Sequence, residues 1–555
     1  MRVRPARGEV RQTARKEPEN RPVSIPGPIR GWVASGSLAA PEPGGAEVLE
    51  NFFPTATSAI LRRGSARYAT LGDGDLPVTA LFSYRNGNQE ELFGATEDAV
   101  YNITTITSAF NYLLATETGD TLVTDTGDNF GELSTFGLDV LSGQTGGDWV
   151  VVQFATSGGV FLRGVNGEDT PFVYDGTTWD TAPAITGAVP EDLNYVWVYK
   201  SRLFFVEKNS LNAWYLPVDS IGGAASKFPL GGVFNLGGKL LFGSSWSLGD
   251  GAQGGLSEQC IFVSTEGEVA VYQGADPGSA TDWSLVGVYR IGKPLGKHAF
   301  IRAGGDIVIS TDIGKVPLSQ AIQRDYAALS PSAVSAPIET AWNETVELRS
   351  GSPWVSKVWP DKQMMAVALP TVDGTAPEWF VANTRTGAWG KFTGWNATCL
   401  EVFKGRLFFG STDGRVVEAM VTGQDEGLPF TGVYVPMFTD LGAAGYKATG
   451  MCRAVIKARY PVRERLSIQE DYEVNLPPNP DATPVSDESV WGSAVWGSST
   501  WGTAQKASVY QNWRTVTGGG HALAPAVQIT SGEITPLDVE VVRTDLTFKI
   551  GDFTV

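Results

Sequence analysis

Few side chains of this chain could bind a metal ion or act as nucleophiles. It holds two histidines, His298 and His521, and three cysteines, Cys260, Cys399 and Cys452. None lies in a Cys-x-x-Cys, His-Glu-x-x-His or Gly-x-Ser-x-Gly motif. We interpret the histidines as solvated or structurally hydrogen-bonded, and the cysteines, which have small or apolar neighbours, as buried thiols outside any disulfide framework. The sequence therefore predicts no catalytic, cofactor or metal site.

Carboxylates are the one abundant reactive group, with 60 Asp and Glu. Because two carboxylates suffice for glycoside hydrolysis, a propeller glycosidase or carbohydrate-binding protein is the alternative function. Residues 310–315, STDIGK, resemble the start of the sialidase Asp-box, Ser-x-Asp-x-Gly-x-x-Trp, but Val316 and Pro317 stand in its tail and the Trp is missing. Residues 125–132, DTGDNFGE, lack the full spacing of a calcium loop. We interpret residues 310–315 as a hairpin turn and predict no enzyme.

The same turn pattern recurs along the chain: an apolar run, Ser or Thr, an acidic residue, Gly and a β-branched run. The copies are FVSTEGEVAVY (262–272), VISTDIGKVPL (308–318), FGSTDGRVVEA (409–419) and, more loosely, FGATEDAVYNI (93–103). In the first three copies Gly supplies the positive φ of a tight turn between two strands. Recurrence of one hairpin predicts an array of antiparallel units.

Two further patterns indicate how large each unit is. Residues 149–179 hold three glycine-containing turns between four apolar runs, which predicts a four-stranded meander. The segments YKSRLFFV (199–206) and FKGRLFFG (403–410) share five of eight residues and each launch an apolar strand from a polar turn. Four strands per unit and a period of roughly 40 to 50 residues are typical of β-propeller blades. The fold class expected is mostly β, with six to eight irregular blades.

Composition changes at both ends of this array. Residues 1–30 carry eight Lys and Arg against three Glu, with few apolar residues, which predicts a basic flexible arm that orders against a partner. Residues 31–426 would form the propeller platform with inserted loops, and AEVLENFF (46–53) a helical turn or two. Residues 427–555 would form an additional β-sandwich-like C-terminal domain.

The C-terminal region also contains a short aromatic repeat. Trp491, Trp496 and Trp501 each precede a glycine and recur every five residues, which fits neither a helix nor a regular strand. We assign these Trp-Gly units to a turn-rich packing motif. An aromatic platform that binds carbohydrate, or contact with a partner, is the alternative.

The charge of the chain restricts its partners. The formal net charge is −18, and the basic arm makes the remaining chain more acidic still. An acidic surface repels phosphate backbones, which argues against gripping nucleic acid and is compatible with DNA sliding past without adhesion. No apolar stretch approaches the roughly 20 residues that span a bilayer, and no apolar run follows the charged N-terminus as in a secretory signal.

Several longer strings carry a resemblance to a known family. They are GGAEVLENFFPTATSAILRRGSARYAT (44–70), LFSYRNGNQEELFGAT (81–96), CIFVSTEGEVAVYQG (260–274) and YRIGKPLGKHAFIRAGGDIVISTD (289–312). Together with the Trp-Gly region, they resemble the tail nozzle proteins (tail tubular protein B-like, or head–tail stabilisation proteins) of short-tailed bacteriophages, the podoviruses. The resemblance implies a structural virion protein, not an enzyme, with a propeller platform and additional β domains.

The same resemblance implies an assembly. The chain would form a homo-oligomer, a hexameric ring below the adaptor protein, with tail fibre or needle proteins alongside. Double-stranded DNA would pass through its lumen without specific binding, and the host surface would be contacted indirectly. The protein would be made in the host cytoplasm and reside in the virion tail.

A nozzle retains DNA and then passes it at ejection, so the resemblance also implies a gate. The loops 119–132 and 249–256 are rich in glycine and acidic residues, which suits a moving, DNA-repelling surface; ordinary solvated loops are the alternative. The candidate channel or gate residues are Asp120, Asp125, Asp128, Glu132 and Asp250.

Overall fold

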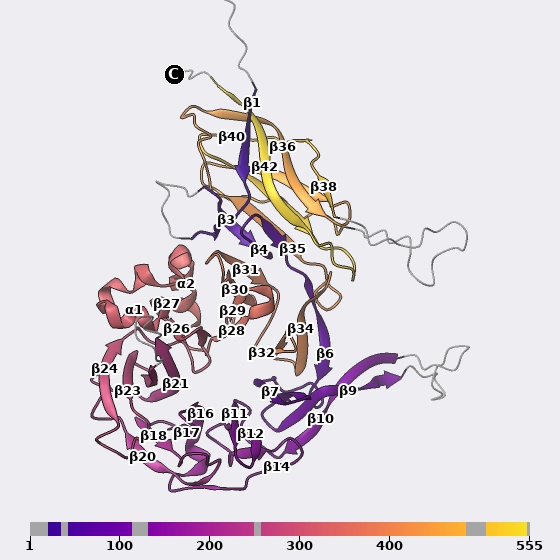
Figure 1. Ribbon diagram of the computed structural model, residues 1–555. Helices are drawn as coiled ribbons and strands as arrows, with labels where there is room; N and C mark the ends of the chain where they lie inside the picture. The colour runs from indigo at the N-terminus through magenta and orange to yellow at the C-terminus, as the bar shows by residue number, and fades with distance from the viewer. Residues whose placement is uncertain (1–19, 35–42, 114–130, 249–256, 484–506, 552–555) are drawn as a thin grey trace, which may run out of the picture.

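The computed structural model describes residues 20–34, 43–113, 131–248, 257–483 and 507–551. Its fold is mostly β, as predicted, and the strands form many sheets. Figure 1 shows two bodies: a broad ring of sheets and a smaller unit above it, which holds both the first and the last described strands.

The ring consists, within the described residues, of seven successive antiparallel sheets. The first four are β7 (Ala80–Asn86), β8 (Gln89–Ala95), β9 (Ala99–Leu113) and β10 (Gly131–Ser142); β11 (Val150–Thr156), β12 (Gly159–Val165), β13 (Phe172–Tyr174) and β14 (Trp179–Asp180); β16 (Leu193–Tyr199), β17 (Arg202–Glu207), β18 (Asn212–Tyr215) and β20 (Ser226–Pro229); and β21 (Leu240–Leu248), β22 (Ser257–Ser264), β23 (Glu268–Gln273) and β24 (Ser284–Arg290). The last three are β25 (Phe300–Ala303), β26 (Asp306–Thr311) and β27 (Gly314–Pro317); β28 (Val355–Trp359), β29 (Met364–Ala368), β30 (Glu378–Asn383) and β31 (Trp389–Thr393); and β32 (Cys399–Phe403), β33 (Arg406–Gly410), β34 (Arg415–Thr422) and β6 (Gly64–Thr70).

The first strands of these sheets lie around the centre of the ring. Strand β7 contacts β11, β11 contacts β16, and β16 contacts β21; further on, β25 contacts β28, β28 contacts β32, and β32 returns to β7. The step from β21 to β25 is made by side chains, since the rings of Phe242 and Phe300 stack with centroids 4.6 Å apart. The circle of inner strands is therefore closed.

The repeated hairpins fall at equivalent places in the sheets. All four copies of the turn pattern join a second strand to a third: β8 to β9, β22 to β23, β26 to β27, and β33 to β34. Gly267, Gly314 and Gly414 have positive φ in these turns, as predicted. The two RLFF segments both join a first strand to a second, β16 to β17 and β32 to β33. Residues 149–179 form the predicted four-stranded meander.

The ring is closed by a strand from far away in the sequence. Strand β6 precedes the first sheet but pairs antiparallel with β34 of the last one. It also forms one parallel bridge, Thr70 to Phe136, with β10, which joins the first and last sheets into one eight-stranded sheet. Unfolding the last sheet therefore requires separating strands more than 340 residues apart in sequence.

Two sheets outside the ring share one hydrophobic core, and we call them the two-sheet unit. One sheet holds β1 (Arg21–Pro26), β4 (Phe52–Pro54), β5 (Ala59–Leu61), β36 (Lys447–Ala458), β38 (Ser508–Tyr510), β39 (Arg514–Thr515), β40 (Gly519–Gly520) and β42 (Glu540–Ile550). The other holds β2 (Gly31–Trp32), β3 (Gly45–Glu50), β35 (Thr431–Pro436), β37 (Glu464–Glu470) and β41 (Leu523–Thr530). Leu49, Phe52, Tyr434, Ile456 and Val527 pack between them.

The second of these sheets is continuous with the ring. Its strands β2 and β3 pair in parallel with β31, so one nine-stranded sheet runs from β28 at the ring centre to β37 in the two-sheet unit. Lys391 of β31 lies 2.7 Å from Glu50 of β3, an ion pair beside this junction. The two bodies are thus joined by main-chain hydrogen bonds as well as by side chains.

The remaining elements are short. The helices α1 (Leu318–Gln323) and α2 (Glu339–Arg349) lie between β27 and β28 and were not predicted from the sequence. Trp342 of α2 is fully buried against Trp354, in a hydrophobic core that the insertion shares with the neighbouring ring sheets. The other short elements are the parallel pair β15 (Ile185–Thr186) and β19 (Gly223–Ala224), and the 3-10 turns η1 (Pro190–Asp192), η2 (Tyr326–Ala328), η3 (Ser330–Ser332), η4 (Ala336–Ile338) and η5 (Pro360–Lys362).

The N-terminal part differs from the sequence prediction. Residues 21–26, expected in the flexible arm 1–30, form β1, which pairs with β42 along six residues. Residues 46–53, expected as a helical turn, lie in β3 and β4 because Leu49 and Phe52 fill the core of the two-sheet unit. The expected platform 31–426 and C-terminal domain 427–555 thus exchange strands, since β2 to β5 belong with the C-terminal strands.

Candidate functional site

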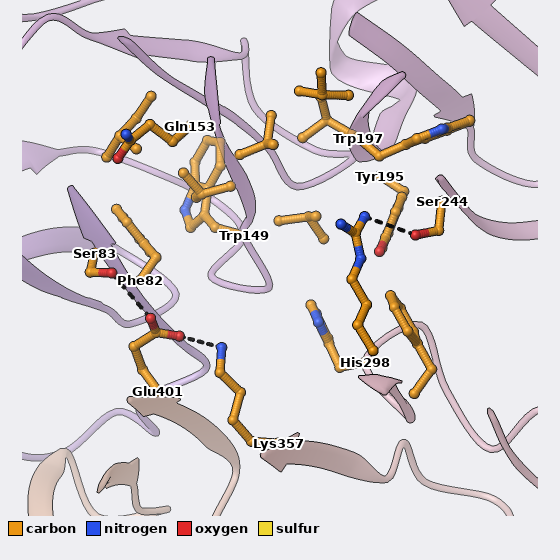
Figure 2. Close-up of a pocket in the computed structure, with 18 of the residues that line it drawn as sticks. Phe82, Ser83, Trp149, Gln153, Tyr195, Trp197, Ser244, His298, Lys357 and Glu401 are labelled. Carbon is orange, nitrogen blue, oxygen red and sulfur yellow. Dashed lines mark hydrogen bonds and ion pairs between the residues drawn. The ribbon is translucent and has the colours of Figure 1, made fainter. Parts of the chain in front are cut away.

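A cavity of about 870 Å³ lies at the centre of the ring (Figure 2). Its walls come from the inner strand of every sheet: β7, β11, β16, β21, β25, β28 and β32. Small-molecule sites typically measure about 300 to 1,000 Å³. The cavity therefore has the size of a ligand pocket.

One side of this cavity holds an ion pair. Lys357 Nζ of β28 lies 2.5 Å from Glu401 Oε2 of β32, and Ser83 of β7 donates a 3.1 Å hydrogen bond to Glu401 Oε1. Glu401 is the one carboxylate among the described residues that line the cavity. Because a glycosidase needs two carboxylates that face one substrate, the described lining lacks that arrangement.

The opposite side holds a cation without a carboxylate. The Arg302 side chain of β25 donates a 3.0 Å hydrogen bond to Ser244 Oγ of β21, the only hydrogen bond its guanidinium makes within the described residues. Tyr195 of β16 lines the same cavity and is buried, and its hydroxyl has no hydrogen-bond partner in the same part of the chain. Burial raises the pKa of Tyr195, so this hydroxyl remains a neutral hydrogen-bond donor.

A second cavity, of about 430 Å³, adjoins the first near the start of β11 and β25. Asp148 lies here, with its carboxylate 2.8 Å from Lys297 Nζ and 3.3 Å from His298 Nε2. Burial disfavours the ionised carboxyl, but the hydrogen bond from His298 and the charge of Lys297 outweigh it and lower the pKa of Asp148. The prediction that His298 is hydrogen-bonded within the fold is confirmed.

The Asp-box-like turn, residues 310–315, does not form an open site. Lys315 is fully buried, and its Nζ lies 2.7 Å from Ser310 Oγ and 3.0 Å from Ser356 Oγ of the next sheet. No carboxylate pairs with it in the residues the structure describes, and burial lowers its pKa to about 7. The segment is a hairpin turn, as predicted, with a buried amine that joins two sheets.

Four of the five gate residues predicted from the sequence lie outside the described residues. Asp120, Asp125, Asp128 and Asp250 lie outside the described residues, as do Trp491, Trp496 and Trp501. Glu132 lies in β10, where its backbone is opposite Tyr112 of β9. The gate and the role of the Trp-Gly units stay predictions.

The other reactive groups have structural surroundings. Cys260, Cys399 and Cys452 are free and buried, as predicted, and burial raises the pKa of each thiol. His521 Nδ1 lies 3.3 Å from the carbonyl oxygen of Ala444. Within the described residues, no group of three or more His, Cys, Asp or Glu could hold a metal ion.

Sequence reasoning missed the residues that line the central cavity. Arg302, Lys357 and Glu401 come from three strands up to a hundred residues apart, so no local motif links them. The available signal was a single charged residue inside each short apolar strand: FIRA, VSKVW and CLEVF. A charged side chain within a short apolar strand is stable only if it faces solvent or an opposite charge or hydrogen-bond partner.

Comparisons with known proteins do not assign the chain to a family. No protein-family model and no curated protein matches it. Among solved structures, it is similar to a computationally designed protein, Ika8, at 12% identity with a TM-score of 0.33, covering 64% of this chain and all of that one. It is also similar to U3-55K, at 10% identity with a TM-score of 0.32, covering 62% of this chain and 95% of that one. In the described part of the chain, no helix is long and apolar enough to span a membrane.

Proposed function

We propose that the seven sheets are the blades of a β-propeller, that the two-sheet unit is a β-sandwich, and that the chain is a structural subunit of a short phage tail. It forms the ring-shaped nozzle that extends the DNA channel below the adaptor. The support for the propeller is the closed circle of inner strands and the equivalent placement of the repeated hairpins. The support for the phage role is the resemblance of the quoted strings, together with the acidic charge.

The observation that carries a structural role is the rigid attachment of the two bodies. The nine-stranded sheet crosses from the ring into the two-sheet unit, and Arg62 and Asp425 form a buried ion pair beside it. A subunit of a tube that transmits DNA under load needs its parts fixed to one another. Hydrogen-bonded sheet continuity supplies that rigidity.

The DNA lumen lies between copies in this proposal, not inside one ring. The central cavity of a single chain has the volume of a small-ligand site and cannot admit a duplex. Six acidic chains around an axis present a negative wall, past which DNA slides with little adhesion. The adaptor lies above this ring and the tail fibre or needle proteins lie beside it, in the virion tail.

Native mass spectrometry and negative-stain microscopy of the purified full chain, alone and with an adaptor ring, test this proposal. A six-fold ring, or six copies docked on the adaptor, is the expected result. A persistent monomer that also hydrolyses aryl glycosides would overturn it in favour of the sialidase-like alternative. Glu401→Gln then serves as the control, because it removes the one carboxylate described in the central cavity.

A further inference from the structure

The central cavity is positively lined in a strongly acidic protein. Its described lining contains Arg302 and Lys357 but only one carboxylate, Glu401, and Lys357 neutralises that carboxylate at 2.5 Å. The third basic side chain of the lining, His298, lies 3.3 Å from the Asp148 carboxylate. The chain as a whole carries a formal charge of −18. A local excess of cations against such a background favours an anion at this place.

The donors that face this anion come from neighbouring strands. Arg302 is exposed to the opening and uses one terminal nitrogen for Ser244, which leaves its other N–H groups without a partner in the described part of the chain. Tyr195 is about nine-tenths buried, lines the same cavity as Arg302, and interacts electrostatically with its charge. A phenol without a partner and the remaining N–H groups of the guanidinium, both in the lining of one cavity, leave hydrogen-bonding capacity that an oxyanion would satisfy.

The rest of the cavity fits an organic group with hydroxyls. Phe300 and Val151 contribute apolar wall, while Ser83, Gln153 and Glu401 offer hydrogen-bonding groups. The volume of about 870 Å³ exceeds what a bare inorganic ion fills. Walls of this mixed kind orient a small molecule through a few polar contacts.

We propose that the ring-centre cavity binds a small hydroxylated organic oxyanion, a carboxylate or a phosphate ester, with Arg302 and Tyr195 holding the anionic group. The site is independent of the nozzle function, since it lies within one chain. Carboxylate and phosphate share the chemistry that a guanidinium fork recognises. A binding experiment distinguishes a carboxylate ligand from a phosphate ester.

Isothermal titration calorimetry of the full chain with four probes tests the site: D-glucuronate, glucose 6-phosphate, glucose and inorganic phosphate. One or both sugar anions bind, glucose does not, and inorganic phosphate binds at least about tenfold more weakly than the better sugar anion. Whichever sugar anion binds more tightly identifies the source. Absence of binding by both sugar anions, equal binding of glucose, or inorganic phosphate binding as tightly as the sugar anions overturns the proposal.

Substitutions tie the binding to the named residues. Arg302→Gln keeps a donor for Ser244 but removes the charge, and it weakens binding about tenfold or more. Tyr195→Phe keeps the buried ring and weakens binding less, whereas Glu401→Gln removes a negative charge and tightens it. The matched control is Arg324→Gln, an exposed arginine just after α1 that bonds only Gln320 of that helix among the described residues. Equal effects of Arg302→Gln and Arg324→Gln, with unchanged thermal unfolding, would show that net charge and not this site attracts the anion.

Discussion

Arg62 Nη2 lies 2.5 Å from Asp425 Oδ2, and these two residues stand on the two chain crossings between the ring and the two-sheet unit. Arg62 separates β5 from β6, and Asp425 separates β34 from β35. The pair is bidentate, with Arg62 Nη1 2.9 Å from Asp425 Oδ1, and the arginine side chain is fully buried. Phe430 and Trp395 cover the guanidinium, whose carbon lies 3.9 Å and 4.4 Å from the two ring centroids.

Arg62→Ala will lower the free energy of unfolding by about 3 kcal/mol, because it leaves the partly buried Asp425 carboxylate, with its side chain 17% exposed, without its ion-pair partner. Urea denaturation measures the loss. The matched control is Arg63→Ala, which breaks the more exposed pair with Asp538 and costs about 1 kcal/mol or less. Equal losses in the two variants would mean that Arg62 does not fasten the two bodies.

Lys315 predicts a pH dependence of stability. Its pKa is about 7 in the folded chain and near its ordinary value of 10.5 when unfolded, so the unfolded state binds more protons between these values. The contribution of Lys315 to stability therefore rises with pH between 7 and 10.5, with a slope of at most about 1.4 kcal/mol per pH unit.

Lys315→Met tests this dependence, since methionine fills similar space and the hydroxyls of Ser310 and Ser356, 3.3 Å apart, still bond each other. At pH 7 the variant will be more stable than the natural chain. The advantage will shrink as pH rises toward 9.5, measured by urea unfolding in matched buffers. A difference that stays constant with pH would show that Lys315 is protonated to the same extent in both states.

Gly267→Ala will destabilise the hairpin between β22 and β23 more than Gly87→Ala destabilises the hairpin between β7 and β8. Both glycines have positive φ, so both substitutions carry the cost of that conformation, about 1 to 2 kcal/mol. A Cβ at Gly267 would also collide with the carbonyl oxygen of Gly292, whereas nothing lies within 4 Å of one at Gly87. Equal shifts in thermal midpoint would contradict the close approach at Gly267.

Removal of β1 will destabilise the two-sheet unit. A chain that begins at residue 28 loses the ladder with β42, the 2.6 Å hydrogen bond from Ser24 to Asp545, and the bond from the Tyr434 hydroxyl to Pro26. Compared with a chain that begins at residue 20, it will unfold at lower temperature, with faster hydrogen exchange in β42. The same exchange rate in both chains would mean that β1 adds no stability to the sheet.

Local turn chemistry explains why much of the ring could be predicted from sequence. Glycines such as Gly267 and Gly414 mark positive φ directly, and the apolar runs beside them read as strands. The prediction of a helical turn over residues 46–53 was wrong. Leu49 pairs with Tyr434, nearly four hundred residues away, and this strand pairing overrides helix propensity. The helices α1 and α2 interrupt the array at a place that no repeat marks.

The candidate site was harder to predict for the same reason. Arg302, Lys357 and Glu401 line one cavity only because the inner strands close into a circle, which is a property of the whole ring. From its local sequence, each of these residues would be predicted to be a solvent-exposed charged residue in a short strand. By contrast, residues 310–315 could be interpreted as a hairpin turn from the local sequence alone. The Trp that completes an Asp-box is absent from the residues that follow this segment.

The composition of the two-sheet unit has a consequence for how the chain is made. Strands β1, β3 and β5 precede the ring strands along the chain, but their partners β42 and β35 follow all of the ring strands. Strand β6 likewise cannot pair, and the ring cannot close, until β34 has been translated. Strands β1, β3 and β5 therefore reach their native pairing only after the whole ring has been translated, and the ring sheets are made while these strands are still unpaired.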